Sequence, residues 1–434
     1  MPYAKGDRLP AETTSRLGHL DVLNSELVKA LYKQFEASPE TLVPPATVWQ
    51  PFPPLDSPLK IIFGVDGSIQ TIRDERPPGR ELAFVKTALL RLDPIAMSKL
   101  NQRAPHPFAI RDLMKDAAVY HATVFPLKNI RLPNRSVRNT VRQVIFESMN
   151  DASLEGEVLS TLRWLAYQEW SPIPSPLSMF ECPHCDQTVA TLPIGSLTGQ
   201  CPGCSGDLFL TDWLGFHLDM ADDSAPENVA TAYMLIHETL LMFTAIKFFW
   251  NHSRGQLSDC LFVKDGPLAI RAQYSKLVIP IRRFLEYAMA DGYPIHLIGQ
   301  EKSGLFYDHL GFIASSAPSM SIMIPDNTYI SSEIRRAPMQ AAPYGRDTNY
   351  GAKVFVKLSD SHSTVLSIPT GRYIANPTVP DLIGIERILA TLPGISGHLH
   401  EGSLLPIERA HAVASLSTYP SAAIFKLFAQ YQKA

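Results

Sequence analysis

The 434-residue chain lacks several features that mark common protein classes. Its 39 basic and 42 acidic residues give a net charge of −3, which excludes a globally basic nucleic-acid binder but leaves a local basic stripe open. Glycine and proline follow no fixed period, so collagen-like and solenoid chains are excluded. A hydrophobic content of 45% excludes wholesale disorder. The length favours two or three units, at roughly 150 residues per domain.

Long uncharged apolar runs are also missing. The first twenty residues hold no apolar stretch, so no secretory signal is expected. The most apolar segment, 233–250, is short and contains His237, Glu238 and Lys247, which argues against a membrane span. The sequence therefore predicts a cytoplasmic protein with no membrane association. It has neither a GxxxxGK[ST] phosphate loop nor a GxSxG nucleophile elbow.

Cysteine is scarce, yet four of the five cysteines form two matched pairs. Cys182 and Cys185 stand in CPHC, and Cys201 and Cys204 stand in CPGC. Two CxxC pairs at this spacing predict four thiolates on one tetrahedral zinc ion. A cytoplasmic location disfavours disulfides, and the matched pairs disfavour a redox couple. Because four thiolates leave no open coordination position, the predicted zinc is structural.

Apolar patterning predicts a mixed α/β sheet, with strands first and strand–helix–strand crossovers later. Strands are predicted at 59–65, 68–75, 81–92, 258–264, 294–300, 351–358 and 363–369. Helices are predicted at about 20–35, 226–250, 269–290, 380–392 and 406–431. The predicted segments are an N-terminal helix with a Pro-rich arm (1–57), the first part of the sheet core (58–94), a mostly helical insertion (95–175), the zinc ribbon (176–212) and the rest of the core (213–434).

One basic run lies within the predicted helical insertion. Lys128, Arg131, Arg135, Arg138 and Arg142 occur with no acidic residue between them. Such a run could follow the phosphate backbone of DNA. A solvated basic helix face is an equally weighted interpretation.

Two predicted strands each end on an Asp-Gly pair, at Asp66 and Asp265. An aspartate at the tip of a buried strand is costly to ionise without a cation or hydrogen-bond donors. Two such tips side by side would form a carboxylate cluster of the kind that binds Mg²⁺ or Mn²⁺. Asp-Gly is also a common hairpin turn, and this alternative stays open for Asp66, because another strand follows at once.

A third carboxylate follows from counting along the helix before the second Asp-Gly pair. From Glu238 to the helix end near Trp250 is roughly 18 Å at 1.5 Å per residue. The strand from Asp259 to Asp265 climbs about 20 Å at roughly 3.3 Å per residue. Glu238 is therefore predicted to lie level with Asp265. A salt bridge at the rim is the alternative.

These segments together resemble the NurA nucleases, which are metal-dependent DNA nucleases with an RNase H-like core. The resemblance is carried by VDGS at Asp66, the helix glutamate Glu238, KDGPL at Asp265 and IERAH with His411. Lys302 in GQEKSG resembles the lysine that follows a later core strand of the family.

The resemblance implies an RNase H-like mixed sheet and a deoxyribonuclease that depends on Mn²⁺ or Mg²⁺. Asp66, Glu238 and Asp265 would hold one or two ions. His411 would orient the nucleophile or the scissile phosphate or add a ligand, and Lys302 would neutralise the phosphate. A helix-surface histidine is the plainer interpretation of His411. The family also implies a homodimer that works on DNA with a HerA-like hexameric ATPase, in DNA end processing or in defence against foreign DNA.

Two other classes of function stay open. The chain could be a non-catalytic DNA-binding or adaptor subunit with a degenerate nuclease core. Ser403 favours this class, because it stands where the family often has a tyrosine, whereas the Asp-Gly pairs and His411 oppose it. The chain could also be a zinc-ribbon scaffold unrelated to nucleic acid.

Overall fold

The computed structural model describes residues 18–35, 48–74, 79–92, 118–185, 190–338, 341–397, 402–416 and 424–425. The chain forms two units, Met1–Leu42 and Val43–Ala434. In the first unit, helices α1 (Gly18–Asn24) and α2 (Glu26–Gln34) replace the single helix predicted over 20–35. The break falls at Ser25, whose extended backbone lets its side chain accept a hydrogen bond from the Val28 N–H and start α2.

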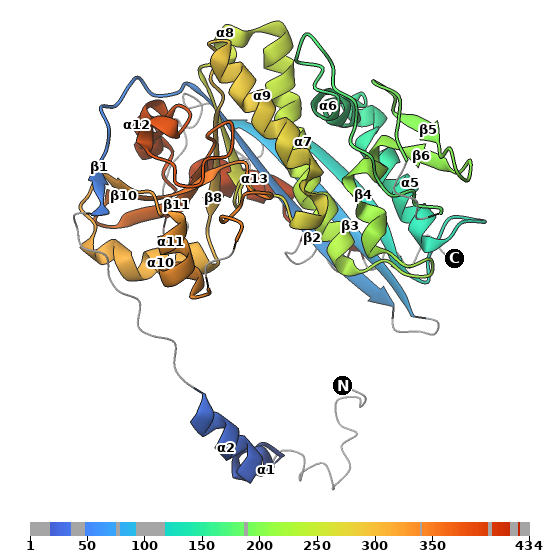
Figure 1. Ribbon diagram of the computed structural model, residues 1–434, viewed down its shortest axis with the longest axis horizontal. Coiled ribbons are helices and arrows are strands. Elements are labelled where there is room, and N and C mark those ends of the chain that lie inside the picture. Colours follow the sequence, from blue (N-terminus) through green and yellow to red (C-terminus); the bar gives the residue numbers. More distant parts are fainter. Residues whose placement is uncertain are drawn as a thin grey trace. The chain divides into compact units, whose positions relative to one another are not determined.

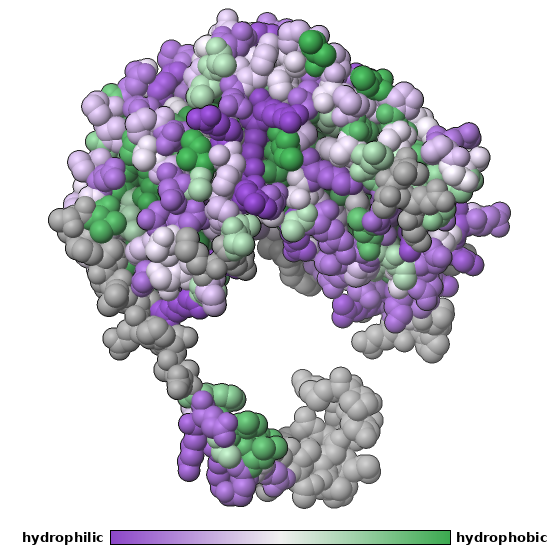
Figure 2. All heavy atoms as spheres, in the orientation of Figure 1, coloured by the Kyte–Doolittle hydropathy of each residue, from purple (hydrophilic) through white to green (hydrophobic). Residues whose placement is uncertain are grey.

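The helix pair of the first unit exposes apolar side chains, which Figure 2 shows as green atoms on α1 and α2. The exposed set comprises Val22, Leu23, Leu27, Val28, Leu31, Tyr32 and Phe35. No described residue of α2 is buried. The described part of this unit therefore has no core of its own.

The second unit is built on a nine-stranded mixed sheet in the order β1-β9-β10-β11-β8-β7-β2-β3-β4 (Figure 1). The neighbours β2, β7 and β8 pair in parallel, and the other pairs are antiparallel. This confirms the predicted mixed α/β class. The strands are β1 (Gln50–Pro51), β2 (Ile61–Asp74), β3 (Arg80–Leu92), β4 (Ala118–Lys128), β7 (Cys260–Asp265), β8 (His296–Glu301), β9 (Ser321–Met323), β10 (Ala352–Ser359) and β11 (His362–Ile368).

Helices cover both faces of this sheet. On one face, α7 (Glu227–His252) and α9 (Val278–Ala290) pack against side chains such as Val65 and Phe262, and Figure 1 shows these two helices across the near side. On the other face, α12 (Ile385–Ile395) and α13 (Leu405–Ala414) pack against the alternate side chains, including Ile62. The sheet is thus buried on both faces around its parallel strands, as βαβ crossovers require.

The remaining elements lie around this sandwich. The four-cysteine region contains the short hairpin of β5 (Thr198–Gln200) and β6 (Asp207–Phe209). The other helices are α5 (Val137–Met149), α6 (Glu157–Ala166), α8 (Arg254–Leu257), α10 (Leu305–Ile313) and α11 (Asn327–Tyr329).

Helix α7 is long and apolar enough, by length and composition alone, to cross a membrane. Within the protein, however, 72% of its most apolar window is buried. Its interior polar residues His237 and Glu238 are buried as well. Helix α7 therefore serves as the central core helix of the second unit.

Strand β2 runs through Asp66 and Gly67 without a break. Asp66 pairs with Ala88 of β3, so both the predicted strand end and the alternative hairpin turn at this position are wrong. The strand continues because β3 offers it a long antiparallel partner and because β-branched residues follow, such as Ile69 and Thr71. It is the parallel neighbour β7 that ends at this level.

Three other boundaries differ from the sequence prediction. Residues 95–117 of the block 95–175 lie outside the described residues, and the described part begins with β4, which extends the sheet as the partner of β3, before α5 and α6 follow. The helix predicted over 269–290 is a 3₁₀ segment (Ala272–Leu277) followed by α9. The last predicted helix ends at Ala414, and most of its predicted remainder lies outside the described residues.

Two glycines of β2 let helices approach from opposite faces. A Cβ on Gly64 would collide with the backbone carbonyl of Pro406 at the start of α13. A Cβ on Gly67 would lie 2.5 Å from Oε1 of Glu238 on α7. The absence of side chains at these positions therefore sets how closely α13 and α7 pack beside Asp66.

We expect Gly64→Ala to destabilise the protein by roughly 1–3 kcal/mol, because the obstacle is backbone and α13 must shift. The matched control is Gly311→Ala in α10, where an added Cβ has no neighbour within 4 Å and should be neutral or slightly stabilising. Urea unfolding of the two variants measures the difference. Equal stability of the two variants would contradict the close packing of α13 on β2.

Candidate active site and cysteine cluster

Two aspartates lie side by side where β2 and β7 stop pairing. The last parallel pair is Val65 with Lys264, so Asp66 and Asp265 follow in register on strands about 4.8 Å apart. Side-chain alternation places both on the face covered by α13, since Ile62 and Val263 belong to the core on that side. The structure therefore brings the two predicted carboxylates together, although only Asp265 ends a strand.

The environment of these aspartates disfavours leaving both charged and unpaired. Asp66 is 3% exposed, and its Oδ1 accepts a hydrogen bond from the N–H of Gly67 at 2.7 Å. Burial raises the pKa of Asp265 above its usual value, and the nearby Asp66 carboxylate adds to the shift. A cation at this position would relieve the strain.

His411 and Lys302 supply positive charge at the two aspartates. Nδ1 of His411 on α13 lies 2.9 Å from Oδ2 of Asp66. Nζ of Lys302, in the residue after β8, lies 2.9 Å from Oδ1 of Asp265. Both basic side chains are partly exposed, at 55% and 34%, so each can reach a bound molecule. The hydrogen bond with Asp66 raises the pKa of His411 above its usual value.

Glu238 approaches from the opposite face of the sheet. Its Oε2 accepts a hydrogen bond of 2.9 Å from Nζ of Lys264, the residue before Asp265. The side chains of the pair are 3% and 2% exposed, so the pair is buried and does not lie at the rim. Burial raises the pKa of Glu238 to about 7, although Lys264 opposes the shift. Residue counting thus predicted the level of Glu238 on the helix but not the face from which it approaches.

The carboxylates do not converge on one point. Among the described residues, the four cysteines form the one group of three or more His, Cys, Asp or Glu side chains whose donor atoms lie within 4.8 Å of one another. At the sheet, Asp66, Asp265 and Glu238 are each held by a basic side chain instead.

A cavity of about 370 Å³ adjoins Asp265 on the α7 side. Lys264 forms part of its wall, and Arg271 and Tyr274 line it as well. Its α7 wall is apolar and consists of Ala232, Leu235 and Ile236. The cavity places open space beside Asp265 and the buried Lys264.

The four predicted zinc ligands form a compact thiol cluster. Sγ of Cys182 lies 3.8 Å from Sγ of Cys204, and Sγ of Cys185 lies 3.8 Å from Sγ of Cys201. A tetrahedron with Zn–S bonds of about 2.3 Å has edges of about 3.8 Å, so these separations fit zinc. Described cysteines form no disulfide. Backbone N–H groups, among them that of Cys204, lower the pKa of Cys201 to about 7, which favours the thiolate that a metal needs.

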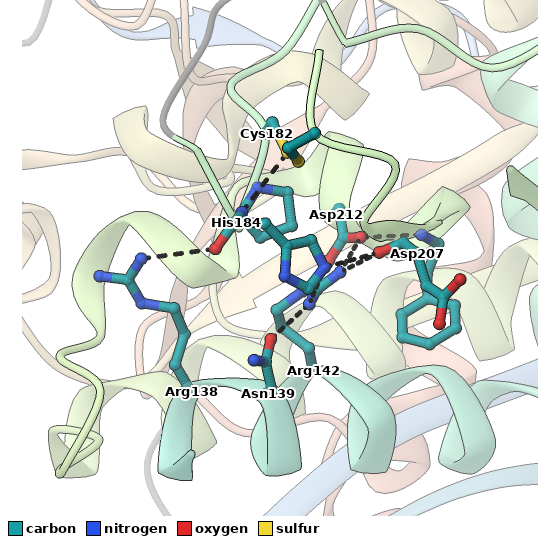
Figure 3. A network of polar contacts seen from close by, with 10 residues as sticks. Arg138, Asn139, Arg142, Cys182, His184, Asp207 and Asp212 are labelled. Atoms are coloured by element: carbon teal, nitrogen blue, oxygen red, sulfur yellow. Dashed lines mark hydrogen bonds and ion pairs between the residues drawn. The ribbon is translucent and has the colours of Figure 1, made fainter. Parts of the chain in front are cut away.

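The basic run does not form one surface, because Arg142 is buried at 3% exposure. Its guanidinium donates to both carboxylate oxygens of Asp212 at 2.8 Å. It also donates to the backbone O of Asp207 at 2.9 Å and contacts Nε2 of His184 at 3.1 Å. Figure 3 shows Arg142 reaching from α5 into the cysteine ribbon. The prediction that Arg142 contacts DNA is therefore wrong.

Arg138 also contacts the ribbon, since it donates to the carbonyl of Pro183 at 3.5 Å as well as to that of Met220. Lys128, Arg131 and Arg135 are exposed and stay candidates for contact with a polyanion. The five basic residues do not form one surface because Arg138 and Arg142 lie on the side of α5 that faces the protein interior.

Sequence reasoning missed Lys264 and Asp212. Lys264 belongs to the predicted apolar strand CLFVK. A lysine inside a buried strand indicates a buried acidic partner, because an unpaired buried ammonium is too costly to tolerate. Asp212 gave no local signal, since its partner Arg142 lies 70 residues away.

Fold and site together define a mixed α/β protein with paired aspartates at a break in parallel pairing and a separate four-cysteine ribbon. No family model matches the chain, and no curated protein matches it. Among solved structures, the chain is similar to the NurA nuclease from Sulfolobus solfataricus, with 9% identity, 98% of each chain covered and a TM-score of 0.34. It is also similar to NurA bound to dAMP and manganese, with 12% identity, 98% of each chain covered and a TM-score of 0.28. Similarity at this level does not define a function.

We expect His411 to titrate above its ordinary pKa of about 6.5 in protein without Mn²⁺ or Mg²⁺, because Asp66 stabilises the imidazolium. The stabilisation is then full below the unfolded-state pKa and is lost as pH rises through the folded-state pKa. Asp66→Asn should return the pKa toward the ordinary value. Ring resonances followed by NMR in buffer without Mn²⁺ or Mg²⁺ measure this, with His411→Gln to assign the signal. An unchanged titration in Asp66→Asn would contradict the pair.

We expect one zinc ion per chain in purified protein, and its loss in Cys201→Ser together with unfolding of the ribbon, because binding and folding are coupled. Cys260→Ala is the matched control, since Cys260 is buried in β7 and should leave the zinc content unchanged. Elemental analysis measures both. Zinc-free wild-type protein would contradict the assignment.

Proposed function

We propose that the chain is a divalent-metal-dependent deoxyribonuclease with an RNase H-like core. The observation that carries the proposal is the pair Asp66 and Asp265 on adjacent strands. His411 contacts Asp66, and Lys302 contacts Asp265. Phosphodiester hydrolysis needs negative ligands for a cation, positive charge for the phosphate and a group that handles a proton. These four side chains supply all three.

The donor set fits Mg²⁺ or Mn²⁺, which prefer carboxylate oxygens. Asp66 and Asp265 would hold the ion, and Glu238 adds a third negative charge from the α7 face. When bound, the ion would polarise the phosphate and lower the pKa of an attacking water. The raised pKa of Asp265 supports this role, because a cation relieves the cost of its buried charge.

The chain's own residues would handle the substrate. Lys302, on turning from Asp265 to the phosphate, would neutralise it as a point charge. His411 is oriented by Asp66, so its other ring nitrogen can bind or transfer a proton at the scissile phosphate. Zinc in the cysteine ribbon would be structural, because four thiolates leave no open position.

The proposed substrate and partners rest on the motifs that resemble NurA nucleases. We propose DNA as substrate and a homodimer in the cytoplasm that works with a HerA-like hexameric ATPase, in DNA end processing or in defence. The net charge of −3 supports the need for delivery, because it gives little long-range attraction to DNA. Exposed Lys128, Arg131 and Arg135 would then line part of the DNA path.

A non-catalytic DNA-binding or adaptor subunit is the second candidate. One argument for it is that each of the three carboxylates already has a basic partner. The other is that Ser403 stands at the position of the family's tyrosine, where it is buried and hydrogen-bonded to Glu408. This candidate predicts bound zinc but no cleavage by the wild-type protein.

We expect Asp66→Asn and Asp265→Asn each to lower Mn²⁺-dependent cleavage of linear DNA by at least about 100-fold, because each removes a charged ligand. The matched control is Asp291→Asn, which breaks only an exposed ion pair with Arg254 and should keep near-wild-type activity. Circular dichroism checks that each variant is folded. Near-wild-type cleavage by either site variant would contradict the assignment.

A further inference from the structure

Lys264 is a buried cation beside the proposed metal site. It lies on β7 immediately before Asp265 and is 2% exposed. Its Nζ donates to Oε2 of Glu238 and to the backbone O of Asp265, each at 2.9 Å. Two hydrogen bonds and the strand itself thus fix the ammonium, in contrast to Lys302, which is 34% exposed and can turn away.

The position of Lys264 determines what Glu238 can bind. Lys264 and Glu238 meet on the α7 face, whereas Asp66 and Asp265 point to the α13 face. The ammonium occupies Oε2 of Glu238, and the other oxygen lies against Gly67 of β2. A second ion shared between Glu238 and Asp265 would therefore have to displace Lys264.

The charge balance points the same way. Asp66, Asp265 and Glu238 carry three negative charges when ionised. Lys264 cancels one of them permanently, whereas Lys302 leaves Asp265 when it turns to the phosphate. His411 adds no charge when its ring is neutral. The two charges that remain match one divalent ion. A second ion would leave an excess of two positive charges in a largely desolvated site, which costs far more than a surface imbalance.

We propose that Lys264 is a positioning residue that takes the place of a second metal ion, so that the site holds one divalent ion per chain, on Asp66 and Asp265. This inference rests on the proposed nuclease function. It narrows the expectation of one or two ions and assigns Glu238 to Lys264 instead of to the metal.

The test counts Mn²⁺ ions on the full chain by calorimetric titration and by electron paramagnetic resonance of free Mn²⁺. Wild type should bind one Mn²⁺ at the carboxylates. Lys264→Met keeps the aliphatic length but frees Glu238, and the adjoining cavity gives access, so this variant should gain a second Mn²⁺ or bind the first about 10-fold more tightly. A damaged fold would lower metal binding, so a gain cannot come from instability. Lys264→Arg should restore one ion.

The double variant Glu238→Gln with Lys264→Met removes both charges of the pair at once. It should still bind one Mn²⁺, within about threefold of the wild-type affinity, because the ligands Asp66 and Asp265 stay. This comparison holds even if Lys264→Met alone fails to fold. Asp66→Asn, by contrast, should lose Mn²⁺ binding.

Two Mn²⁺ ions on a wild-type protein that cleaves DNA would overturn only the role of Lys264. A double variant that loses Mn²⁺ as completely as Asp66→Asn would do the same, since Glu238 would then be a direct ligand. Wild-type protein that neither binds Mn²⁺ nor cleaves DNA would overturn the proposed function, and the inference with it.

Discussion

The structure depends on a mismatch in length between two parallel strands. β7 ends at Asp265, while β2 continues past Asp66 because β3 carries its ladder onward. The mismatch leaves one edge of β2 without a parallel neighbour at the point where two carboxylates stand in register. Gly64 and Gly67 lie on either side of Asp66, and their missing side chains let α13 and α7 close on that point. The unequal strand lengths thus place the two carboxylates, and the two glycines allow the helices to pack beside them.

Three ion pairs surround this point, and they differ in how far the basic partner is exposed. The Lys264–Glu238 pair is buried on both sides, so separating it would leave an uncompensated charge in a medium of low polarity. The pairs of Asp66 with His411 and of Asp265 with Lys302 have partly exposed basic partners, so solvent or a ligand can replace those partners. The site therefore has a fixed half on the α7 face and an exchangeable half on the α13 face, and the exchangeable half is the one at which we propose that metal and phosphate bind.

Local sequence patterns predicted the elements that depend mainly on neighbouring residues. Apolar runs gave β7, β8 and the β10–β11 hairpin, and helix spacing placed Glu238 at the level of Asp265. The errors arose where distant partners decide. Continuation of β2 depends on β3, and burial of Arg142 depends on Asp212, 70 residues away. The face from which Glu238 approaches depends on how α7 packs on the sheet, which no residue count supplies.

The two proposed metal sites differ in donor chemistry, and the fold keeps them apart. Carboxylate oxygens at the sheet suit Mg²⁺ and Mn²⁺, whereas thiolates in the ribbon suit zinc. Zinc would otherwise outcompete Mn²⁺ at a mixed site, because divalent affinities rise steeply from manganese to the later metals. The ribbon has its own anchor, since Arg142 ties α5 to Asp212 and to the backbone of Asp207 and makes no contact with the carboxylates at the sheet. The separation gives each proposed ion a set of ligands of the type it prefers, because the thiolates of the ribbon are soft donors and the carboxylates at the sheet are hard donors.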